Sequence, residues 1–175
     1  VHAGEAWQFY RDIFGRDSID DGGLVIVGTG YYGQAFDNAF WDGDEFAAGG
    51  HHEGIFGYLT GRTIVVHETG HGVNGGALIY AGQSGALEES KADVLALMAD
   101  QRYHSHLPHE ATWLIGAEAF EDTLLQGRAI RAIKDPPAYD DPLIGRDPSR
   151  FHMRDLYQGY DDYGGVHINS TIPTR

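Results

Sequence analysis

Two histidines lie four residues apart in the stretch VVHETGHGVN, and a glutamate directly follows the first of them. On a helix, this H-E-x-x-H spacing places both imidazoles on one face, one turn apart, where they can bind a single zinc ion. His67 and His71 are therefore candidate metal ligands. Glu68 is a candidate general base for a water at the metal. The alternative is a solvated histidine pair on a helix that Gly70 and Gly72 weaken.

A zinc site needs a third protein ligand, and the next predicted helix supplies carboxylates. Glu89 follows His71 at a distance that leaves room for a helix end, a turn and a reversal. Asp93 lies one turn further on the same face, where it can bond the free ring nitrogen of a ligand histidine and fix its tautomer. The alternative is a solvated acidic face. The apolar neighbours Leu87 and Val94 argue against it.

Later residues can complete a hydrolytic site. His167 follows two glycines, a backbone suited to close approach, and Asp162 precedes it at a spacing that lets the carboxylate orient the ring. Arg131 is the cation with the most motif-like setting, in RAIRAIKDP. On its own, however, it is better explained as a surface charge on a helix.

Hydrophobic periodicity and turn residues predict the elements that must position these side chains. For the first part of the chain we expect a helix over Gly4–Arg16 that stops at Gly15, a strand over 24–32, a strand over 38–46 running into a turn at Asp42-Gly43, and a glycine-rich separator over 47–54. This part is therefore predicted to contain the β structure.

The remainder is predicted to be mostly helical. We expect helices over 58–74, 87–103 and 118–133, a Pro- and Asp-rich loop over 134–152, and an extended or early helical piece over 164–173. The first of these helices should end at the glycines that follow Asn74. The second is the strongest, because Leu87, Val94, Leu95 and Met98 fall on one apolar stripe.

Composition excludes several classes of function. The chain has 175 residues, which suits one ordinary domain, and a formal net charge of -14 that opposes binding to a nucleic-acid backbone. No apolar run is long enough for a membrane span. There is no cysteine, so thiol catalysis and iron–sulfur ligation are excluded, and a metal must be bound by histidine, carboxylate or carbonyl oxygen.

Five segments then stand in a meaningful order: NAFWDG, HETGHGV, LIYAGQSGALEESKAD, AIRAIKDP and GGVHINSTIP. Together they resemble the successive signatures of the thermolysin-like neutral metallopeptidases, over essentially the whole chain. The resemblance implies that His67, His71 and Glu89 bind zinc, that Glu68 is the base, and that Asp93 bonds His67.

The same resemblance implies further roles around the metal. Tyr80 and His167 would stabilise the oxyanion, with Asp162 orienting His167. Arg131 would bind a substrate carbonyl, and Asn38 and Ala39 would hold the substrate backbone along an edge strand. Ile64, Ile115 and Ile130, by their places beside the matched motifs, would line an apolar pocket. That pocket would favour bulky apolar residues directly after the cleaved bond. The alternative for these isoleucines is ordinary core.

Several positions depart from the family pattern that the chain resembles. Gly70 replaces a larger residue, and Glu88 stands where an asparagine commonly supports a ligand histidine. Acidic positions that would bind a pair of calcium ions are replaced by Thr63, Thr112, Leu114 and Ala117. We therefore predict zinc without the paired-calcium site, and leave other calcium binding open.

These observations predict an α+β fold with a thermolysin-like metallopeptidase core. Residues 1–57 would form a helix plus a β-containing lobe with the substrate edge, and residues 58–175 a helical lobe with the zinc site, which lies in the cleft between the two lobes. The two would form one compact catalytic unit, either truncated or unusually small. The expected function is zinc-dependent endopeptidase activity on extracellular peptide or protein substrates, with secretion implied by the resemblance. The alternative is a catalytically weak metal-binding or interaction domain derived from such a peptidase.

Overall fold

The structure, a computed structural model, describes residues 1–34, 36–50, 56–120, 128–134, 140–141, 145–146, 149–150 and 152–174. The helices are α1 (His2–Phe14), α2 (Arg62–Asn74), α3 (Gly82–His104), α4 (Asp161–Thr174) and the short 3-10 turns η1 (Ala117–Ala119) and η3 (Met153–Asp155). The strands are β1 (Gly28–Gly30), β2 (Ala39–Trp41), β3 (Phe46–Ala48), β4 (Leu114–Ile115), β5 (Arg131–Ala132), β6 (Asp140–Asp141) and β7 (Gly145–Arg146).

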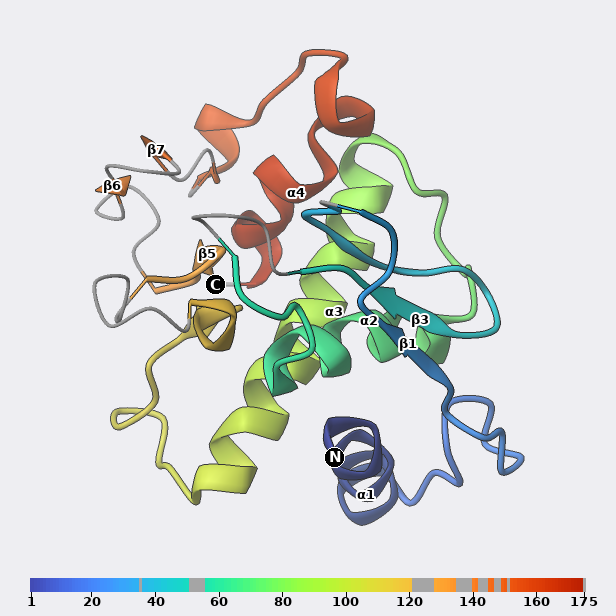
Figure 1. Cartoon of the computed structure of the whole chain (residues 1–175). Helices are drawn as coiled ribbons and strands as arrows, with labels where there is room; N and C mark the ends of the chain where they lie inside the picture. The colour runs from blue at the N-terminus through green and yellow to red at the C-terminus, as the bar shows by residue number, and fades with distance from the viewer. Residues whose placement is uncertain are drawn as a thin grey trace.

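Small sheets precede a mostly helical part, as predicted, and α3 runs through the middle of the molecule (Figure 1). The first sheet has the order β1-β3-β2, with β1 parallel and β2 antiparallel to β3. Strand β2 is therefore an edge strand. β4 pairs with β5, and β6 with β7, as two-stranded antiparallel ribbons. No helix in the described ranges is long and apolar enough to cross a membrane.

The predicted turn chemistry is confirmed where an element ends. Gly15 after α1 and Gly75 after α2 both adopt left-handed backbone angles, with φ of 67° and 61°, which glycine reaches without a steric penalty. Between β2 and β3 the Asp42 carboxylate accepts hydrogen bonds from the backbone N–H groups of Asp44 and Glu45. These bonds close the predicted hairpin.

Other predicted elements were wrong in extent or type. The strand over 24–32 contracts to β1, because only three residues pair with β3, and Val25 is exposed. The helix over 58–74 begins at Arg62, since Tyr58 forms a bridge to Gly50 instead. The C-terminal segment, in contrast, agrees with the prediction of an early helical piece: it is helical from Val166, after a left-handed turn that includes both glycines.

The helix predicted over 118–133 is also wrong at both ends. Its start is a single 3-10 turn, η1, and its end is strand β5, where Arg131 pairs with Ile115 of β4. Residues 121–127 lie outside the described ranges. Within the predicted loop over 134–152, β6 and β7 form a short ribbon. Pairing between distant segments decides these conformations, which local periodicity does not report.

The apolar stripe predicted on α3 was expected to be buried, but most of it is exposed to solvent. Leu87, Val94 and Met98 are exposed, at 44%, 37% and 40% of their surface. The buried face of α3 instead carries small residues together with the carboxylates: Ala86, Glu88, Glu89, Ser90, Ala92, Asp93, Ala96, Leu97 and Ala99. Small side chains let α2 and α4 pack closely against α3. This close packing buries the carboxylates, and not the flanking large apolar residues from which their burial was predicted.

Two apolar clusters flank α2. One joins α1, α2, α3 and β4, and the other joins α2 to the first sheet. The first comprises Ala6, Phe9, Tyr10, Val66, Ala96, Leu97, Ala99, Ile115 and Ile133. The second comprises Phe46, Ala48, Leu59, Ile64, Val65, Ala119 and Phe120. The helix with the H-E-x-x-H motif is therefore packed on both sides, which fixes its position relative to α3.

A buried arginine of α2 forms hydrogen bonds with side chains of α1 and α3. Arg62, the first residue of α2, donates to Glu5 of α1 at 2.9 Å and to Asp100 of α3 at 3.3 Å. Its guanidinium also lies over the Tyr103 ring, 3.4 Å from the ring centroid. Burial opposes ionisation of Glu5, but bonds from His2 and Arg62 outweigh it and hold the pKa of Glu5 below its usual value.

Candidate metal centre

The two motif glycines allow α2 to lie close to its neighbours. A Cβ on Gly70 would lie 3.2 Å from the Cα of Ala92 on α3, and a Cβ on Gly72 would lie 2.8 Å from Ile19 Cγ2 and 3.0 Å from the Trp41 ring. Glycine lowers helix propensity by up to about 1 kcal/mol relative to alanine. At these positions it also permits the approach of α3 on one side and β2 on the other.

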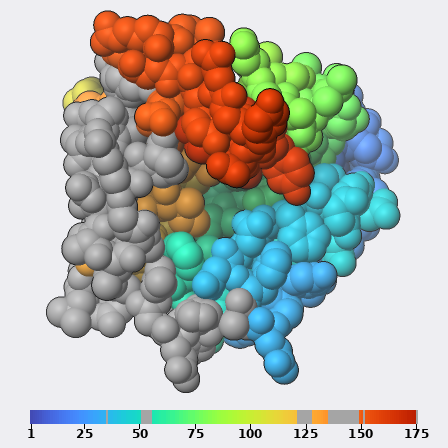
Figure 2. Space-filling model, turned by 90° about the horizontal axis from the view of Figure 1, so that it is seen from above, coloured from blue at the N-terminus to red at the C-terminus, as the bar shows by residue number. Residues whose placement is uncertain are grey.

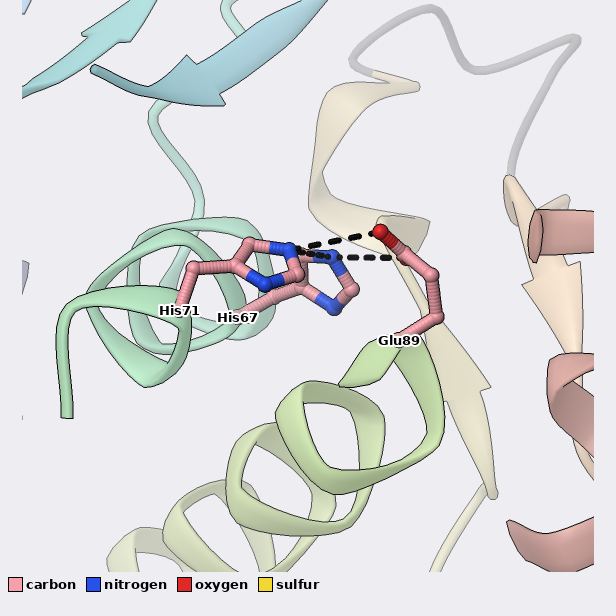
Figure 3. A group of neighbouring side chains, drawn as sticks. All are labelled: His67, His71 and Glu89. Atoms are coloured by element: carbon pink, nitrogen blue, oxygen red, sulfur yellow. Dashed lines mark hydrogen bonds and ion pairs between the residues drawn. The ribbon is translucent and has the colours of Figure 1, made fainter. Parts of the chain in front are cut away.

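His67, His71 and Glu89 converge on one point (Figure 3). The two Nε2 atoms are 3.2 Å apart, and they lie 3.2 and 3.4 Å from the Glu89 carboxylate oxygens. The ligand atoms of a tetrahedral zinc with bonds near 2.1 Å are about 3.3 Å apart. Glu89 Oε2 is buried and makes no hydrogen bond to a described residue, although His67 Nε2 is nearby. The donor set and its spacing therefore fit zinc.

Asp93 contacts the ring of His67 at Nδ1, the nitrogen that does not face Glu89. Its Oδ1 lies 2.9 Å from His67 Nδ1, so an Nδ1–H tautomer donates to Asp93 and leaves Nε2 facing Glu89. Burial opposes ionisation of Asp93, but Arg131 and His67 outweigh it and hold the pKa of Asp93 below its usual value. For His67, burial lowers the pKa, and the carboxylates of Glu89 and Asp93 outweigh this and raise it to about 10. Bound metal would replace that extra proton.

Arg131 contacts the same Asp93 carboxylate that bonds His67. Its Nη2 donates to Asp93 Oδ1 at 2.6 Å and its Nε donates to Asp93 Oδ2 at 3.2 Å. The residue is on β5 and lines the cavity, so it is not the surface helix charge that the sequence alone favoured. Charge-assisted paired bonds of this kind fix a guanidinium in one orientation.

Glu68 is 7% exposed and lines the same cavity as the three converging residues. Burial raises the pKa of its carboxyl, and nearby His67 and His71 oppose that rise only in part. A carboxylate made more basic by burial is suited to accept a proton from water. This is the property that the candidate base requires.

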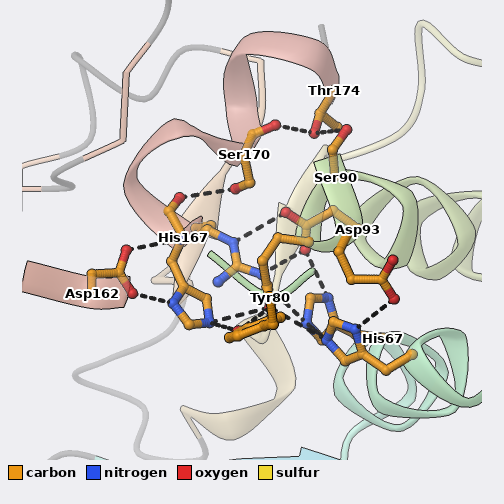
Figure 4. A network of polar contacts seen from close by, with 12 residues as sticks. His67, Tyr80, Ser90, Asp93, Asp162, His167, Ser170 and Thr174 are labelled. Atoms are coloured by element: carbon orange, nitrogen blue, oxygen red, sulfur yellow. Dashed lines mark hydrogen bonds and ion pairs between the residues drawn. The ribbon is translucent and has the colours of Figure 1, made fainter. Parts of the chain in front are cut away.

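A second group of polar side chains contacts Glu89. Figure 4 shows its members Tyr80, His167 and Asp162. The Tyr80 hydroxyl donates to Glu89 Oε1 at 2.5 Å and lies 3.2 Å from His167 Nε2. Asp162 lies 2.5 Å from His167 Nδ1 and also accepts the backbone N–H groups of His167 and Ile168. Asp162 thus fixes the ring and the start of the right-handed part of α4. The four residues from Asp162 to Gly165 form a left-handed turn that brings this carboxylate into place.

The three converging residues, together with Glu68, Tyr80, Arg131 and His167, line a cavity of about 780 Å³. Figure 2 shows the surface hollowed between the C-terminal part, in red, and the β-containing part around β2 and β3, in cyan. Ile64, Ile115 and Ile130 line it, while Ile64 and Ile115 also belong to the two apolar clusters. The pocket and core interpretations of these isoleucines are therefore compatible.

The cavity also has lining residues that sequence reasoning did not select: Phe40, Trp41, Phe56, Leu59, Leu78 and Tyr163. Phe40 and Trp41 directly follow the predicted edge residues Asn38 and Ala39, so their place on the edge strand was a usable signal. Leu78 lies in a loop, and Tyr163 lies in the left-handed turn at the start of α4; neither segment has a hydrophobic periodicity. Their approach to the cavity depends on how α3 and α4 pack, which no local pattern reports.

Asn38 and Ala39 line the cavity at the edge strand β2. The Asn38 carbonyl accepts the backbone N–H of Gly49, and the Asp42 N–H donates to the Glu45 carbonyl. The backbone groups of the even-numbered residues therefore point toward β3 and its flanking residues. Because the backbone groups of successive residues alternate sides along a strand, those of Ala39 and Trp41 point to the open edge. That edge can accept a further extended strand.

Comparison with known families covers the whole chain. Residues 1–75 match a family model described as thermolysin metallopeptidase, catalytic domain, and residues 76–175 match one described as thermolysin metallopeptidase, alpha-helical domain. The chain belongs to the thermolysin metallopeptidase family. The family and fold predicted from the five motifs are therefore confirmed.

Individual members of the family agree with this assignment. The chain is 42% identical to the extracellular metalloprotease of Pectobacterium carotovorum subsp. carotovorum over 99% of its length and 51% of the relative's. It is 39% identical to protease PrtS of a Photorhabdus species, over 97% and 47% of the two lengths. The precursor of protealysin from Serratia proteamaculans superimposes with a TM-score of 0.89 at 37% identity, over 99% of this chain and 55% of that one. The chain thus spans about half the length of these relatives.

Proposed function

We propose that this chain carries the catalytic centre of a zinc-dependent endopeptidase. The observation that carries the proposal is the convergence of the His67 and His71 Nε2 atoms with Glu89 at tetrahedral spacing, next to the buried Glu68 and inside a cavity. Membership of a metallopeptidase family and relatives named as metalloproteases support it.

His67, His71 and Glu89 would hold the metal. A bound zinc ion supplies Lewis-acid activation of a water and of a substrate carbonyl. Glu68 accepts the proton of the attacking water and can then pass it to the leaving amine.

Tyr80 and His167 both lie beside Glu89, one of the proposed metal ligands. With a substrate present, the Tyr80 hydroxyl and a protonated His167 Nε2 donate hydrogen bonds to the oxygen on which negative charge develops. Asp162 keeps His167 oriented for this role. One preorganised donor of this kind is worth roughly 3 kcal/mol of activation free energy.

Substrate binding follows from the cavity and the strand edge. An extended peptide would pair with the outward backbone groups of Ala39, assisted by the Asn38 side chain, while Arg131 binds a substrate carbonyl. Ile64, Ile115 and Ile130 provide an apolar surface, so we propose a preference for bulky apolar side chains directly after the cleaved bond. The relatives named extracellular support secretion of the protein that contains this chain.

The test is zinc content together with cleavage of an internally quenched peptide with leucine after the scissile bond. We expect one zinc per chain and faster cleavage of this peptide than of a matched peptide with aspartate there. Zinc binding without cleavage would contradict the enzyme assignment and favour a metal-binding domain. A chain that takes up no zinc after reconstitution would contradict both.

We also propose that the chain does not use the paired-calcium site. Asp100 bonds the Arg62 guanidinium, and both the Thr63 N–H and hydroxyl donate to Glu118. A buried arginine thus provides a fixed positive charge between α1, α2 and α3 where Glu5 and Asp100 approach each other. A protein-borne cation of this kind removes the need for a bound one.

Replacing that cation should destabilise the protein whether or not calcium is present. Arg62→Met keeps the apolar stem but leaves Glu5 and Asp100 with only their histidine partners, His2 and His104, and we expect a loss of about 2 kcal/mol, allowing for the partly exposed Glu5. Because the folded-state pKa of Glu5 is lowered, its contribution is present above the unfolded-state pKa and disappears as pH falls. Denaturant unfolding at neutral and acidic pH, with calcium or with EGTA plus zinc, measures both effects.

The matched control is Arg102→Met. Arg102 pairs with Asp12 and so also joins α3 to α1, but the two side chains are 48% and 31% exposed. Solvent screens such a pair, so little change is expected. Equal effects of the two substitutions, or full rescue of Arg62→Met by calcium, would contradict the proposal.

A further inference from the structure

Tyr163 is a large aromatic residue in a backbone conformation that such residues rarely adopt. Its φ is 52°, and it lies in the left-handed turn from Asp162 to Gly165. This conformation is sterically unfavourable for a bulky residue, and glycine, asparagine and aspartate are the residues that usually adopt it. The side chain is 70% exposed, and its hydroxyl makes no hydrogen bond to a described residue. Neither backbone preference nor burial therefore explains a tyrosine at this position.

Contacts on both sides of Tyr163 fix the turn in place. Before it, the Asp162 carboxylate contacts the ring of His167 and accepts the backbone N–H of the same residue. After it, the backbone approaches the start of α3 so closely that a Cβ on Gly164 would lie 3.3 Å from Gly82 Cα. The Tyr163 side chain therefore projects from a turn whose position is set by its neighbours.

The ring of Tyr163 lines the cavity next to the ring of Tyr80. The two ring centroids are 5.7 Å apart and the planes are inclined by 66°, which is the edge-to-face arrangement that aromatic pairs favour. Tyr80 is itself 39% exposed. The two rings thus form an aromatic surface in the cavity, on the side of the C-terminal part that Figure 2 draws in red. An exposed apolar surface inside a binding cavity is suited to contact a ligand.

The proposed function places one substrate side chain beside this surface. Tyr80 would donate to the oxygen of the carbonyl group at the cleaved bond, and that carbonyl belongs to the residue before the bond. The side chain of this residue is therefore the one nearest to the two rings. The isoleucines proposed to contact the following residue belong to other segments: α2, β4 and the residue before β5. The cavity thus has two separate apolar surfaces, one for each side of the cleaved bond.

We propose that Tyr163 is a specificity-determining residue: its ring, together with that of Tyr80, favours a large apolar or aromatic side chain directly before the cleaved bond. The inference rests on the proposed function. A tyrosine that only positioned Tyr80 would affect the cleavage of all substrates alike. A surface for a side chain affects only those substrates that have a large side chain at this position.

The experiment compares wild type, Tyr163→Asn and Tyr163→Phe on two quenched peptides. Both peptides have leucine after the cleaved bond, and they have either phenylalanine or alanine before it. Asparagine tolerates the left-handed conformation, so Tyr163→Asn should preserve the turn. Wild type should prefer the phenylalanine peptide, and we expect Tyr163→Asn to reduce the ratio of the two kcat/KM values about fivefold, mainly through KM. Tyr163→Phe keeps the ring and should keep the ratio.

The matched control is Tyr160→Asn. Tyr160 lies three residues earlier in the chain, is 99% exposed and is not among the residues that line the cavity. The same chemical change there should leave both kcat/KM values at the wild-type level. A fall in the ratio equal to that of Tyr163→Asn would overturn the proposal, because it would show an effect that does not come from the cavity.

Binding without cleavage gives a second measurement. In a Glu68→Gln background, calorimetry should show that Tyr163→Asn weakens binding of the phenylalanine peptide about fivefold and changes binding of the alanine peptide little. An unchanged ratio in Tyr163→Asn, or an equal loss of kcat on both peptides, would overturn the proposal, and so would loss of the preference in Tyr163→Phe. A wild type that cleaves neither peptide would contradict the proposed function itself. A wild type that cleaves both peptides equally well would contradict only the role of Tyr163.

Discussion

Glu68→Gln should abolish peptide hydrolysis and leave zinc bound. Glutamine has the same shape as glutamate, so the cavity and the packing of α2 are preserved, but its amide cannot accept a proton from water. General-base catalysis contributes about 10²–10⁴-fold, and the other buried carboxylates that line the cavity, Glu88 and Glu89, already contact histidines, so we expect a loss of roughly 10³-fold in kcat/KM. The measurement is cleavage of the quenched peptide together with zinc content.

Two comparisons give this result its meaning. Glu110→Gln, with the same chemical change at an exposed position, should retain wild-type turnover and zinc. His71→Gln should lose zinc as well as activity, because it removes a ligand atom. A Glu68→Gln protein that retained more than about a tenth of wild-type kcat/KM would contradict the assignment of Glu68 as the base.

The candidate site was predicted largely because its residues are spaced along regular helices. His67 and His71 are one turn apart on α2, and Glu89 and Asp93 are one turn apart on α3, so both pairs project from one face if the helices form at all. The order of the five motifs added the residues that come from separate elements, such as Arg131 and His167. What remained was to bring the two helices together, and the structure does so.

The failures have a common physical cause: local patterns do not report which face of an element meets another element. The large apolar residues of α3 suggested a buried stripe, yet the close approach of α2 and α4 requires small residues such as Ala92. Arg131 was expected in a helix and lies in a strand because it pairs with Ile115. Leu78 reaches the cavity from a loop and Tyr163 from the left-handed turn of α4, and the course of both segments depends on that packing.

Removing zinc should destabilise the protein and loosen one part of α2 in particular. Gly70 and Gly72 lower the intrinsic stability of this helix, and without metal the surrounding carboxylates repel one another. Residues Arg62 to Gly70 of α2 are buried, whereas its last turn, from His71 to Asn74, is only partly buried. A ligand that binds only the folded state at a thousand times its Kd stabilises it by about 4 kcal/mol.

Hydrogen exchange can locate this effect. After chelation, we expect much faster exchange of backbone amides from His71 to Asn74 and around Glu89, with little change near Leu97 in the core of α3. Re-addition of zinc should restore protection, and magnesium should not, because it prefers an octahedral set of oxygen ligands. Both glycines have a packing reason to be present, so protection that stayed equal in the metal-free protein would show that contact with Ala92 and Trp41 alone is enough to hold the helix. Loss of protection confined to the last turn of α2 and to the surroundings of Glu89 would instead show that zinc completes a helix whose packing favours close approach over intrinsic stability.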